Sequence, residues 1–276
     1  MVEILLSTYN GEAYLEELLD SLIAQTYQDW SLTIRDDGST DSTIDIISEY
    51  QHKYGEKITL MDGRKNIGTI KSFELLLQQS IAEYVMLCDQ DDVWMPDKIM
   101  LSLQRMEKAE NGDKSIARLV FSDLCVTDEH LNTTNPSYLK QNRIRLDLNM
   151  RFNYICVANC AAGCTMMLNR AAVRTVLPFP DTISAHDWWM AAMVAKHGKL
   201  TCINRATILY RQHGNNQYGS HDTTHKFYIG RLMHLNSVIR EYGRLKPFLR
   251  DVGFGNMGKF WFYKAVYFIR RRIKHQ

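Results

Sequence analysis

The stretch that decides the fold is YVMLCDQDDVWMP, residues 84–96. Its first part, Tyr84–Cys88, has the apolar composition of a short buried strand. Acidic residues follow in 89–92, and Pro96 stands near the first turn of a helix that we predict to run to Ala109. The acidic residues therefore lie at the carboxyl end of a strand, which is the edge of an open α/β sheet where ligands bind.

Three strand–helix units are predicted upstream of this stretch. The strands are Val2–Ser7, Trp30–Arg35 and Ile58–Met61, and each is followed by apolar residues at helical spacing, the last set ending near Leu77. Strands that alternate with helices predict a mainly parallel central sheet flanked by helices.

Downstream, the pattern predicts four further strands and ends in helix. The strands are Leu119–Ser122, Gly163–Leu168, Leu200–Ile203 and Thr207–Tyr210, with helices from Arg170 and from His186. Residues 123–159 are predicted to form a long functional loop or short irregular elements. Only helix is predicted from Thr223 onward. We place a boundary near Ser220, between a catalytic domain of residues 1–220 and a helical extension of residues 221–276.

Composition and charge narrow the class of protein. Hydrophobic residues make up 45% and charged residues 23% of 276 residues, which predicts a globular chain with a sizeable core. A formal net charge of +2 is not that of a nucleic-acid binder. No uncharged apolar run of about 18 residues exists. Six cysteines without a CxxC pair predict reduced core thiols in a cytoplasmic protein, and Cys160 and Cys164 alone predict no zinc site.

Asp89 and Asp91 have the chemistry of a site for a hard cation. Alternation at the end of a strand puts both side chains on one side and turns Gln90 away. Carboxylates, water and substrate phosphates are the ligands that Mg²⁺ usually takes in proteins. An acidic turn is also common as a solvated loop, so the cluster alone leaves both interpretations open.

Three separated motifs carry a resemblance to a known family. They are Leu6–Gly11 with Ala24–Tyr27, then Asp36–Asp41, then Cys88–Asp97. In this order they resemble the inverting family-two glycosyltransferases, and more narrowly their rhamnosyltransferase-like branch. The resemblance covers about residues 2–216. It implies an α/β protein with the GT-A fold of nucleotide-diphospho-sugar transferases, carrying a C-terminal helical extension.

The resemblance implies a nucleotide site on the first part of the sheet. Ser7 and Tyr9 are expected to contact the base and ribose, and Asp37 to accept the base N3–H, because an ionised carboxylate is a pure acceptor. Asp89 is expected on the ribose side of the DxD motif. Lys71 stands roughly where relatives carry a basic residue that contacts the donor, but a surface lysine on a helix is the preferred interpretation.

The metal and phosphate residues are also implied by the resemblance. Asp91 is expected to bind the divalent cation that bridges the diphosphate, and His213 to add an imidazole ligand, which favours Mn²⁺ over Mg²⁺. Arg211, in the same late loop, is expected to contact phosphate.

The resemblance implies that Asp187 is the general base, because the base of the family lies at the start of a helix about a hundred residues after the metal motif. Inversion by direct displacement needs such a group to take the proton of the acceptor hydroxyl. An aspartate at a helix start is also a good cap, which is the competing interpretation. His186 stands where many relatives carry a second acid. A glycine at Gly163 suits either close backbone approach or a strand bulge. The acceptor or donor sugar is expected near these residues and near Cys164, Asp92 and Trp94.

The tail from Thr223 combines aromatic and basic residues, with no acidic residue after Asp251. This composition suits peripheral contact with anionic lipid at the inner face of the cell membrane, and it suits equally a helix that packs on the catalytic domain or on a second copy in a homodimer.

The expected function is transfer of a sugar from a dTDP- or UDP-sugar, with dTDP-rhamnose suggested by the branch, to a hydroxyl of a cell-surface glycan or lipid-linked saccharide. Two alternatives stay open. One is a metal-dependent nucleotidyltransferase, although the sequence has no Gly-rich phosphate loop. The other is a catalytically degenerate, membrane-associated assembly protein.

Overall fold

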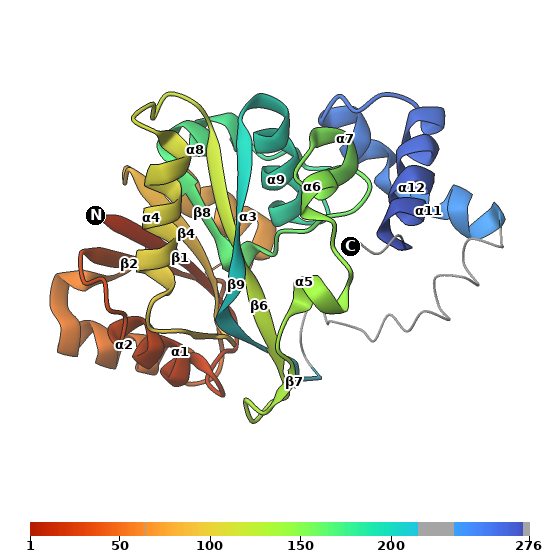
Figure 1. Ribbon diagram of the computed structural model, residues 1–276. Coiled ribbons are helices and arrows are strands. Elements are labelled where there is room, and N and C mark those ends of the chain that lie inside the picture. The colour runs from red at the N-terminus through yellow and green to blue at the C-terminus, as the bar shows by residue number, and fades with distance from the viewer. Residues whose placement is uncertain (64, 215–234, 273–276) are drawn as a thin grey trace.

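A computed structural model of the chain describes residues 1–63, 65–214 and 235–272 (Figure 1). The first half alternates strands and helices: β1 (Val2–Thr8), α1 (Leu15–Ile23), β2 (Trp30–Asp36), α2 (Thr43–Tyr54), the 3₁₀ turn η1 (Gly55–Lys57), β3 (Ile58–Leu60), α3 (Thr69–Gln79) and β4 (Tyr84–Asp89). The three predicted strand–helix units are therefore confirmed, with ends that differ by one or two residues.

The second half is less regular. It comprises β5 (Val93–Trp94), α4 (Lys98–Glu110), β6 (Arg118–Thr127), β7 (Thr133–Asn135), α5 (Tyr138–Gln141), α6 (Leu146–Asn149), α7 (Phe152–Ile155), the 3₁₀ turn η2 (Gly163–Thr165), β8 (Met166–Asn169), α8 (Arg170–Val176), α9 (His186–His197), β9 (Lys199–Arg211), α11 (Leu235–Asp251) and α12 (Met257–Arg272). The expected loop of residues 123–159 contains the end of β6, one short strand and three single-turn helices.

One sheet organises these elements, in the order β3-β2-β1-β4-β8-β6-β9-β5, with β7 paired to β6. The strands β3, β2, β1 and β4 are parallel, whereas β8 runs antiparallel to both β4 and β6. Beyond β4 the sheet is therefore mixed. The α/β fold with a sheet flanked by helices is confirmed.

The continuous apolar run of β4 is explained by burial on both faces of the sheet. Tyr84, Met86 and Cys88 belong to one hydrophobic cluster, which also holds α1, α2 and α4 residues. Val85 and Leu87 belong to a second cluster, formed with α3, α8 and α9. Parallel strands that are covered on both faces show no polar alternation, which is why this strand could be recognised.

Two strand predictions are wrong in detail. Residues 200–210 form one strand, β9, and not two, because Asn204 and Arg205 bulge out where the register with β6 shifts from Ser122↔Ile203 to Asp123↔Ala206. In the sequence, the polar residues Asn204 and Arg205 have the composition of a turn, which is why the pattern predicts two strands. Gly163–Thr165 form a 3₁₀ turn, and the strand starts only at Met166.

The C-terminal helices pack against the catalytic part of the chain (Figure 1). Phe248 lies 5.1 Å from Trp188 of α9, and Tyr263 lies 5.2 Å from Tyr154 of α7, measured between ring centroids. Phe254 and Phe260 belong to the same buried cluster as α9. The predicted boundary near Ser220 falls outside the described residues. None of the described helices is long and apolar enough to cross a membrane.

This packing predicts unequal effects for two phenylalanines of α12. Phe260 is fully buried and contacts the ring of Tyr242, whereas Phe262 is 61% exposed. Phe260→Ala should lower the free energy of unfolding by about 3–5 kcal/mol. Phe262→Ala, the matched control, should change it by no more than about 0.5 kcal/mol. Urea denaturation followed by fluorescence measures both, and equal effects would show that α12 does not belong to the core.

Candidate active site

Strand register brings the predicted nucleotide residues to one edge of the sheet. Ser7 in β1 pairs with Asp89 in β4 on one side and with Arg35 in β2 on the other. Thr8 pairs with Asp36 and donates its hydroxyl to the Asp36 carboxylate at 3.0 Å. The carboxyl ends of these three parallel strands therefore meet, as the sequence predicts.

Gln90 fastens the loop after β1 to the loop after β4. Its Oε1 accepts the Tyr9 N–H at 2.8 Å, and its Nε2 donates to the Tyr9 carbonyl at 3.0 Å. A Cβ on Gly11 would lie 2.6 Å from that Oε1, so a larger residue there would push the Gln90 amide out of its present position. Gln90 does point away from its aspartate neighbours. Tyr9 itself is 48% exposed, which leaves its ring free to stack on a base.

Asp37 is buried and holds the turn that precedes α3. Its Oδ1 accepts Arg35 Nη1 at 2.6 Å and the Ile67 N–H at 2.8 Å, and its Oδ2 accepts the Gly68 N–H at 2.8 Å. A carboxylate has about four acceptor positions, so one position on Oδ2 is left for a base imide. The sequence indicated the possible ligand contact but not this structural role.

Asp91 and His213 lie together although 122 residues separate them in the sequence. His213 Nε2 is 2.9 Å from Asp91 Oδ2, and the imidazole packs against the ring of Tyr14 at 4.7 Å. A carboxylate and an imidazole at this distance are a ligand pair that suits Mn²⁺. Their roles as metal ligands stay a prediction.

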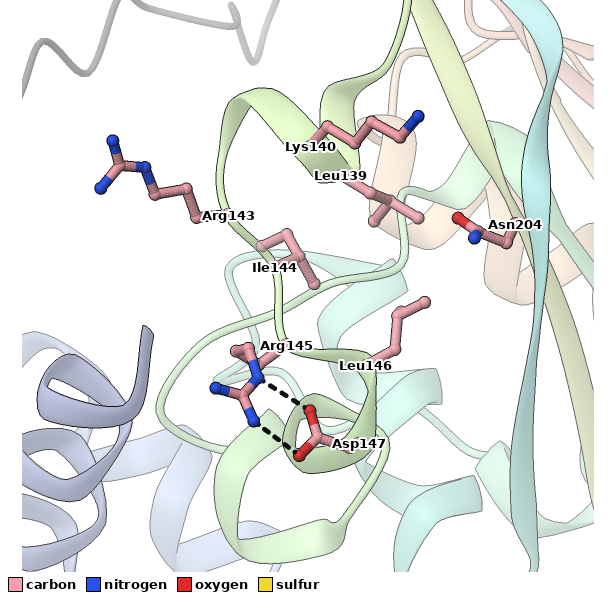
Figure 2. A pocket seen from close by; sticks show the side chains of 8 residues that line it. All are labelled: Leu139, Lys140, Arg143, Ile144, Arg145, Leu146, Asp147 and Asn204. Atoms are coloured by element: carbon pink, nitrogen blue, oxygen red, sulfur yellow. Dashed lines mark hydrogen bonds and ion pairs between the residues drawn. The ribbon is translucent and has the colours of Figure 1, made fainter. Parts of the chain in front are cut away.

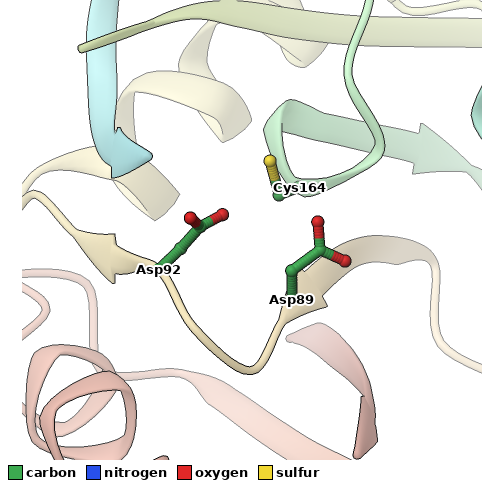
Figure 3. Close-up of side chains that lie close together, drawn as sticks. All are labelled: Asp89, Asp92 and Cys164. Atoms are coloured by element: carbon green, nitrogen blue, oxygen red, sulfur yellow. The ribbon is translucent and has the colours of Figure 1, made fainter. Parts of the chain in front are cut away.

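A second cluster lies deeper: Asp89, Asp92 and Cys164 point toward one another (Figure 3). One carboxylate oxygen from each aspartate and the thiol sulfur are all within 4.8 Å of each other. Burial, and then the Asp91 charge, raise the pKa of both aspartates. Asp92 Oδ2 accepts no hydrogen bond from the part of the chain that the structure describes. Acidic oxygens in such surroundings fit a bound divalent cation nearby. Burial also raises the pKa of the Cys164 thiol, so this group stays protonated and is a poor ligand.

Lys98 lies beneath this acidic cluster, fully buried. Its Nζ donates to the Cys164 carbonyl at 2.8 Å and lies 4.5 Å from the centroid of the Trp94 ring. Burial lowers the pKa of Lys98 to about 8, so the ammonium is still mostly charged at pH 7. Sequence reasoning missed this residue, because a lysine in the first turn of a helix ordinarily faces solvent.

Asp187 is the second residue of α9, whose N-cap is Ala185, and it lies beside the Gly163 turn. Its Oδ1 accepts the Trp188 N–H at 2.6 Å, and its Oδ2 accepts Asn159 Nδ2 at 3.2 Å. Burial raises the pKa of Asp187 to about 6. The negative charge of Asp187 also contributes to the raised pKa of Asp89, so the two carboxylates are close enough to repel each other. A carboxyl group with a pKa near neutrality is suited to general-base work.

His186 and Gly163 meet beside Asp187. A Cβ on Gly163 would lie 3.0 Å from His186 Nε2, so close approach, and not a strand bulge, accounts for this glycine. The imidazole stacks on Phe73 at 4.5 Å, and its Nε2 has no hydrogen bond from residues 1–63, 65–214 or 235–272. Burial lowers the pKa of His186 to about 4, so it is neutral at pH 7 and adds no charge beside Asp187.

Comparison with known proteins identifies the family. The family model "Glycosyl transferase family 2" matches residues 3–177, more than half of the chain. The chain belongs to this family. It is therefore a glycosyltransferase of the inverting type. The dTDP-rhamnosyl transferase RfbG of Shigella flexneri is 30% identical over 227 residues, which are 78% of this chain and 74% of that protein. An uncharacterized glycosyltransferase of Haemophilus influenzae is 30% identical over 221 residues, 78% of this chain and 66% of that protein.

Solved structures confirm the GT-A fold of this glycosyltransferase. The crystal structure of S. aureus TarS 1-349 superposes with a TM-score of 0.60 at 19% identity, over 76% of this chain and 60% of that one. The mannosyltransferase PcManGT from Pyrobaculum calidifontis, solved with GDP-Man and Mn²⁺, superposes with a TM-score of 0.58 at 17% identity, over 100% of this chain and 76% of that one. At these identities the likeness concerns the fold.

Four of the expected ligand contacts are corrected by burial. Trp94 is 2% and Cys164 1% exposed, and Asp92 is completely buried, with its Oδ1 accepting the Arg211 N–H at 3.1 Å. None of these three side chains can touch a sugar directly in this arrangement. The Arg211 guanidinium is also buried: it donates to the Asp91 carbonyl at 2.9 Å, to the Glu129 carbonyl at 2.6 Å and to the Glu17 carboxylate. Arg211 therefore holds the 91–92 loop in place and does not face a phosphate.

Lys71 lies on α3 and is paired with acidic side chains. Its Nζ is 2.9 Å from Glu74 Oε2 and 2.9 Å from Asp181 Oδ1. These ion pairs fit the interpretation of Lys71 as a surface lysine, and its contact with the donor stays a prediction.

Proposed function

We propose that this glycosyltransferase transfers L-rhamnose from dTDP-rhamnose to a hydroxyl of a cell-surface glycan or lipid-linked saccharide, at the cytoplasmic face of the membrane. The observation that carries the proposal is the convergence of Asp91 with His213 and of Asp89 with Asp187 at one sheet edge. The similarity to a dTDP-rhamnosyl transferase over most of both chains supports the choice of donor.

In the proposed complex, the nucleotide lies across the ends of β1, β2 and β4. Tyr9 stacks on the base, Asp37 accepts its imide N–H through Oδ2, and Ser7 and Asp89 meet the ribose side. The Gln90 clamp supports this geometry, because its two hydrogen bonds fix the Tyr9 backbone relative to the loop after β4. Positions held in advance of binding lower the entropy lost when a ligand is bound.

Asp91 and His213 would hold Mn²⁺ or Mg²⁺ against the donor diphosphate. When bound, the cation supplies positive charge that stabilises the leaving nucleotide diphosphate. The chain contributes the rigid frame of that site: Arg211 fixes the Asp91 carbonyl, and its N–H fixes the Asp92 carboxylate. The mannosyltransferase PcManGT, which shares the fold, was solved with Mn²⁺, and this is consistent with the proposal.

Asp187 would take the proton of the acceptor hydroxyl as the sugar transfers. The Trp188 N–H and the Asn159 amide orient its carboxylate. The Gly163 turn lies directly beside this carboxylate, so it is the natural floor of the acceptor site. Membership of a glycosyltransferase family leaves no support for the nucleotidyltransferase. The presence of Asp89, Asp91, Asp187 and His213 supports an active enzyme over a degenerate assembly protein that keeps the same fold. Contact of the tail with membrane or with a second copy remains part of the proposal.

The metal assignment predicts that binding of dTDP depends on a divalent cation. Asp91→Asn should weaken Mn²⁺-supported binding at least tenfold, since even residues around metal ligands are worth about 10–100-fold in affinity. Asp97→Asn is the matched control, because Asp97 lies six residues away and pairs with the exposed Arg205. Calorimetric titration with Mn²⁺ and with EDTA measures both. Equal wild-type affinity in Mn²⁺ and in EDTA would overturn the metal assignment.

If Asp187 is the base, kcat/KM for the acceptor should decrease at acidic pH, and this decrease should disappear when Asp187 is replaced. Because burial raises its pKa to about 6, the carboxyl is protonated below that pH and cannot accept a proton, so kcat/KM for the acceptor should fall about tenfold per pH unit below 6 and level off above it. Asp187→Asn should keep dTDP binding, remove this pH dependence and lower transfer by about 10²–10⁴-fold.

Asp181→Asn is the control for this experiment, since Asp181 is exposed and lies in the loop before the same helix. It should transfer sugar at the wild-type rate. If Asp187→Asn also transfers at that rate at saturating donor and acceptor, the role of Asp187 is structural: its side-chain oxygen accepts the Trp188 N–H in the first turn of α9, which an asparagine oxygen can also do.

A further inference from the structure

A cavity of about 390 Å³ opens between α5 and α6 (Figure 2). None of the residues that line it belongs to the acidic cluster of Asp89, Asp92 and Cys164. Its wall combines aliphatic and basic side chains from one short segment. The aliphatic ones are Leu139, Ile144 and Leu146, and the basic ones are Lys140, Arg143 and Arg145. Three basic residues thus lie within eight consecutive positions, beside carbon of the aliphatic side chains.

Two of these cations have no carboxylate partner within the described chain. Arg145 forms a two-bond ion pair with Asp147, with Nε and Nη2 each 3.0 Å from a carboxylate oxygen (Figure 2). Asp147, the acidic residue that lines the cavity, is therefore already paired with Arg145. The exposed side chains of Lys140 and Arg143 make no hydrogen bond or ion pair with any residue in the described ranges 1–63, 65–214 and 235–272. The cavity mouth therefore carries net positive charge.

The end of α12 adjoins this cavity and extends the basic surface. Arg145 Nη1 donates to the Arg270 carbonyl at 2.7 Å, which ties the cavity wall to the last turns of the helix. The sequence from 252 to 272 contains no acidic residue. Phe260 and Tyr267, seven residues apart, are buried on one face of α12, whereas Phe262 and Ile269, also seven apart, are 61% and 60% exposed on another. A seven-residue spacing is two helical turns, so each pair lies along one side of the helix.

We propose that this surface, formed by Lys140, Arg143, Arg270, Phe262 and Ile269, docks the enzyme on an anionic lipid bilayer. The cations contact lipid phosphates, and the two apolar side chains enter the boundary between headgroups and acyl chains. Apolar side chains bordered by arginine and lysine are the composition of interfacial helices. The inference deepens the proposed function and rests on it in one respect: a lipid-linked acceptor would lie in the bilayer that the surface contacts.

Charge complementarity favours a bilayer over a second copy of the chain. A two-fold symmetric dimer through this face would set the same cations of both copies against each other, because such an interface uses one patch twice. Like charges placed opposite each other oppose association. An anionic lipid surface instead offers many phosphates to cations that have no carboxylate partner in the described chain.

The test is flotation of the full chain with vesicles of phosphatidylcholine, with or without phosphatidylglycerol. Lys140→Glu/Arg143→Glu should weaken binding to the anionic vesicles about 25-fold or more, since each basic residue near such a surface contributes about fivefold to partitioning. Lys53→Glu/Lys108→Glu changes the net charge equally on exposed positions of α2 and α4 and should bind like the wild type. Phe262→Ser/Ile269→Ser should also lose binding.

Hydrolysis of soluble dTDP-rhamnose without vesicles is the second measurement, and all these variants should retain it, which shows that they are folded. Absence of wild-type binding to anionic vesicles, equal losses for the two charge-reversed pairs, or equal binding to neutral vesicles would overturn the inference. So would a dimer, seen by light scattering, that Lys140→Glu/Arg143→Glu dissociates while vesicle binding persists. Vesicle binding without any donor hydrolysis would instead contradict the proposed function and leave the docking surface standing.

Discussion

The parallel pairing of β1 with β2 and β4 is the constraint on which the site depends. Because Ser7 lies between Arg35 and Asp89 in the sheet, the loops that follow the three strands must emerge side by side. Gln90 then joins two of these loops through both ends of its amide. A shift of register by one residue would turn every buried side chain of β1 to the other face, so the same apolar burial that stabilises the sheet also fixes the site.

Burial of charge is the energetic cost of this arrangement. Asp92 is a fully buried carboxyl group and Asp89 is a half-buried one beside it, and isolated buried charges are strongly disfavoured. Lys98 offsets part of this cost with a buried ammonium, and its hydrogen bond to the Cys164 carbonyl holds the turn that also contains Gly163. A divalent cation beside Asp91 would offset more of it. The charges of Asp89, Asp92 and Lys98 thus lie between the proposed metal ligand Asp91 and the Gly163 turn of the proposed acceptor site.

Local sequence patterns predicted the first half of the fold well, because each of its strands is a short apolar run between turn residues. They also predicted that Asp91 and His213 would act together, on the strength of a family resemblance. They failed where long-range contacts decide the outcome: the Asn204–Arg205 bulge of β9, the burial of Lys98, and the inward-facing Arg211. The neighbouring sequence of a lysine, an arginine or a polar pair does not show whether the side chain is solvated or bonded to a buried carbonyl.

The central claim is displacement of the nucleotide in a single inverting step at this sheet edge. It is tested most directly by ¹H NMR of the sugar first released from dTDP-rhamnose in the presence of Mn²⁺, recorded before mutarotation. Water then takes the place of the acceptor hydroxyl at the face served by Asp187, so the account predicts initial release of the anomer opposite in configuration to the donor. Initial release of the anomer with the configuration of the donor would contradict it.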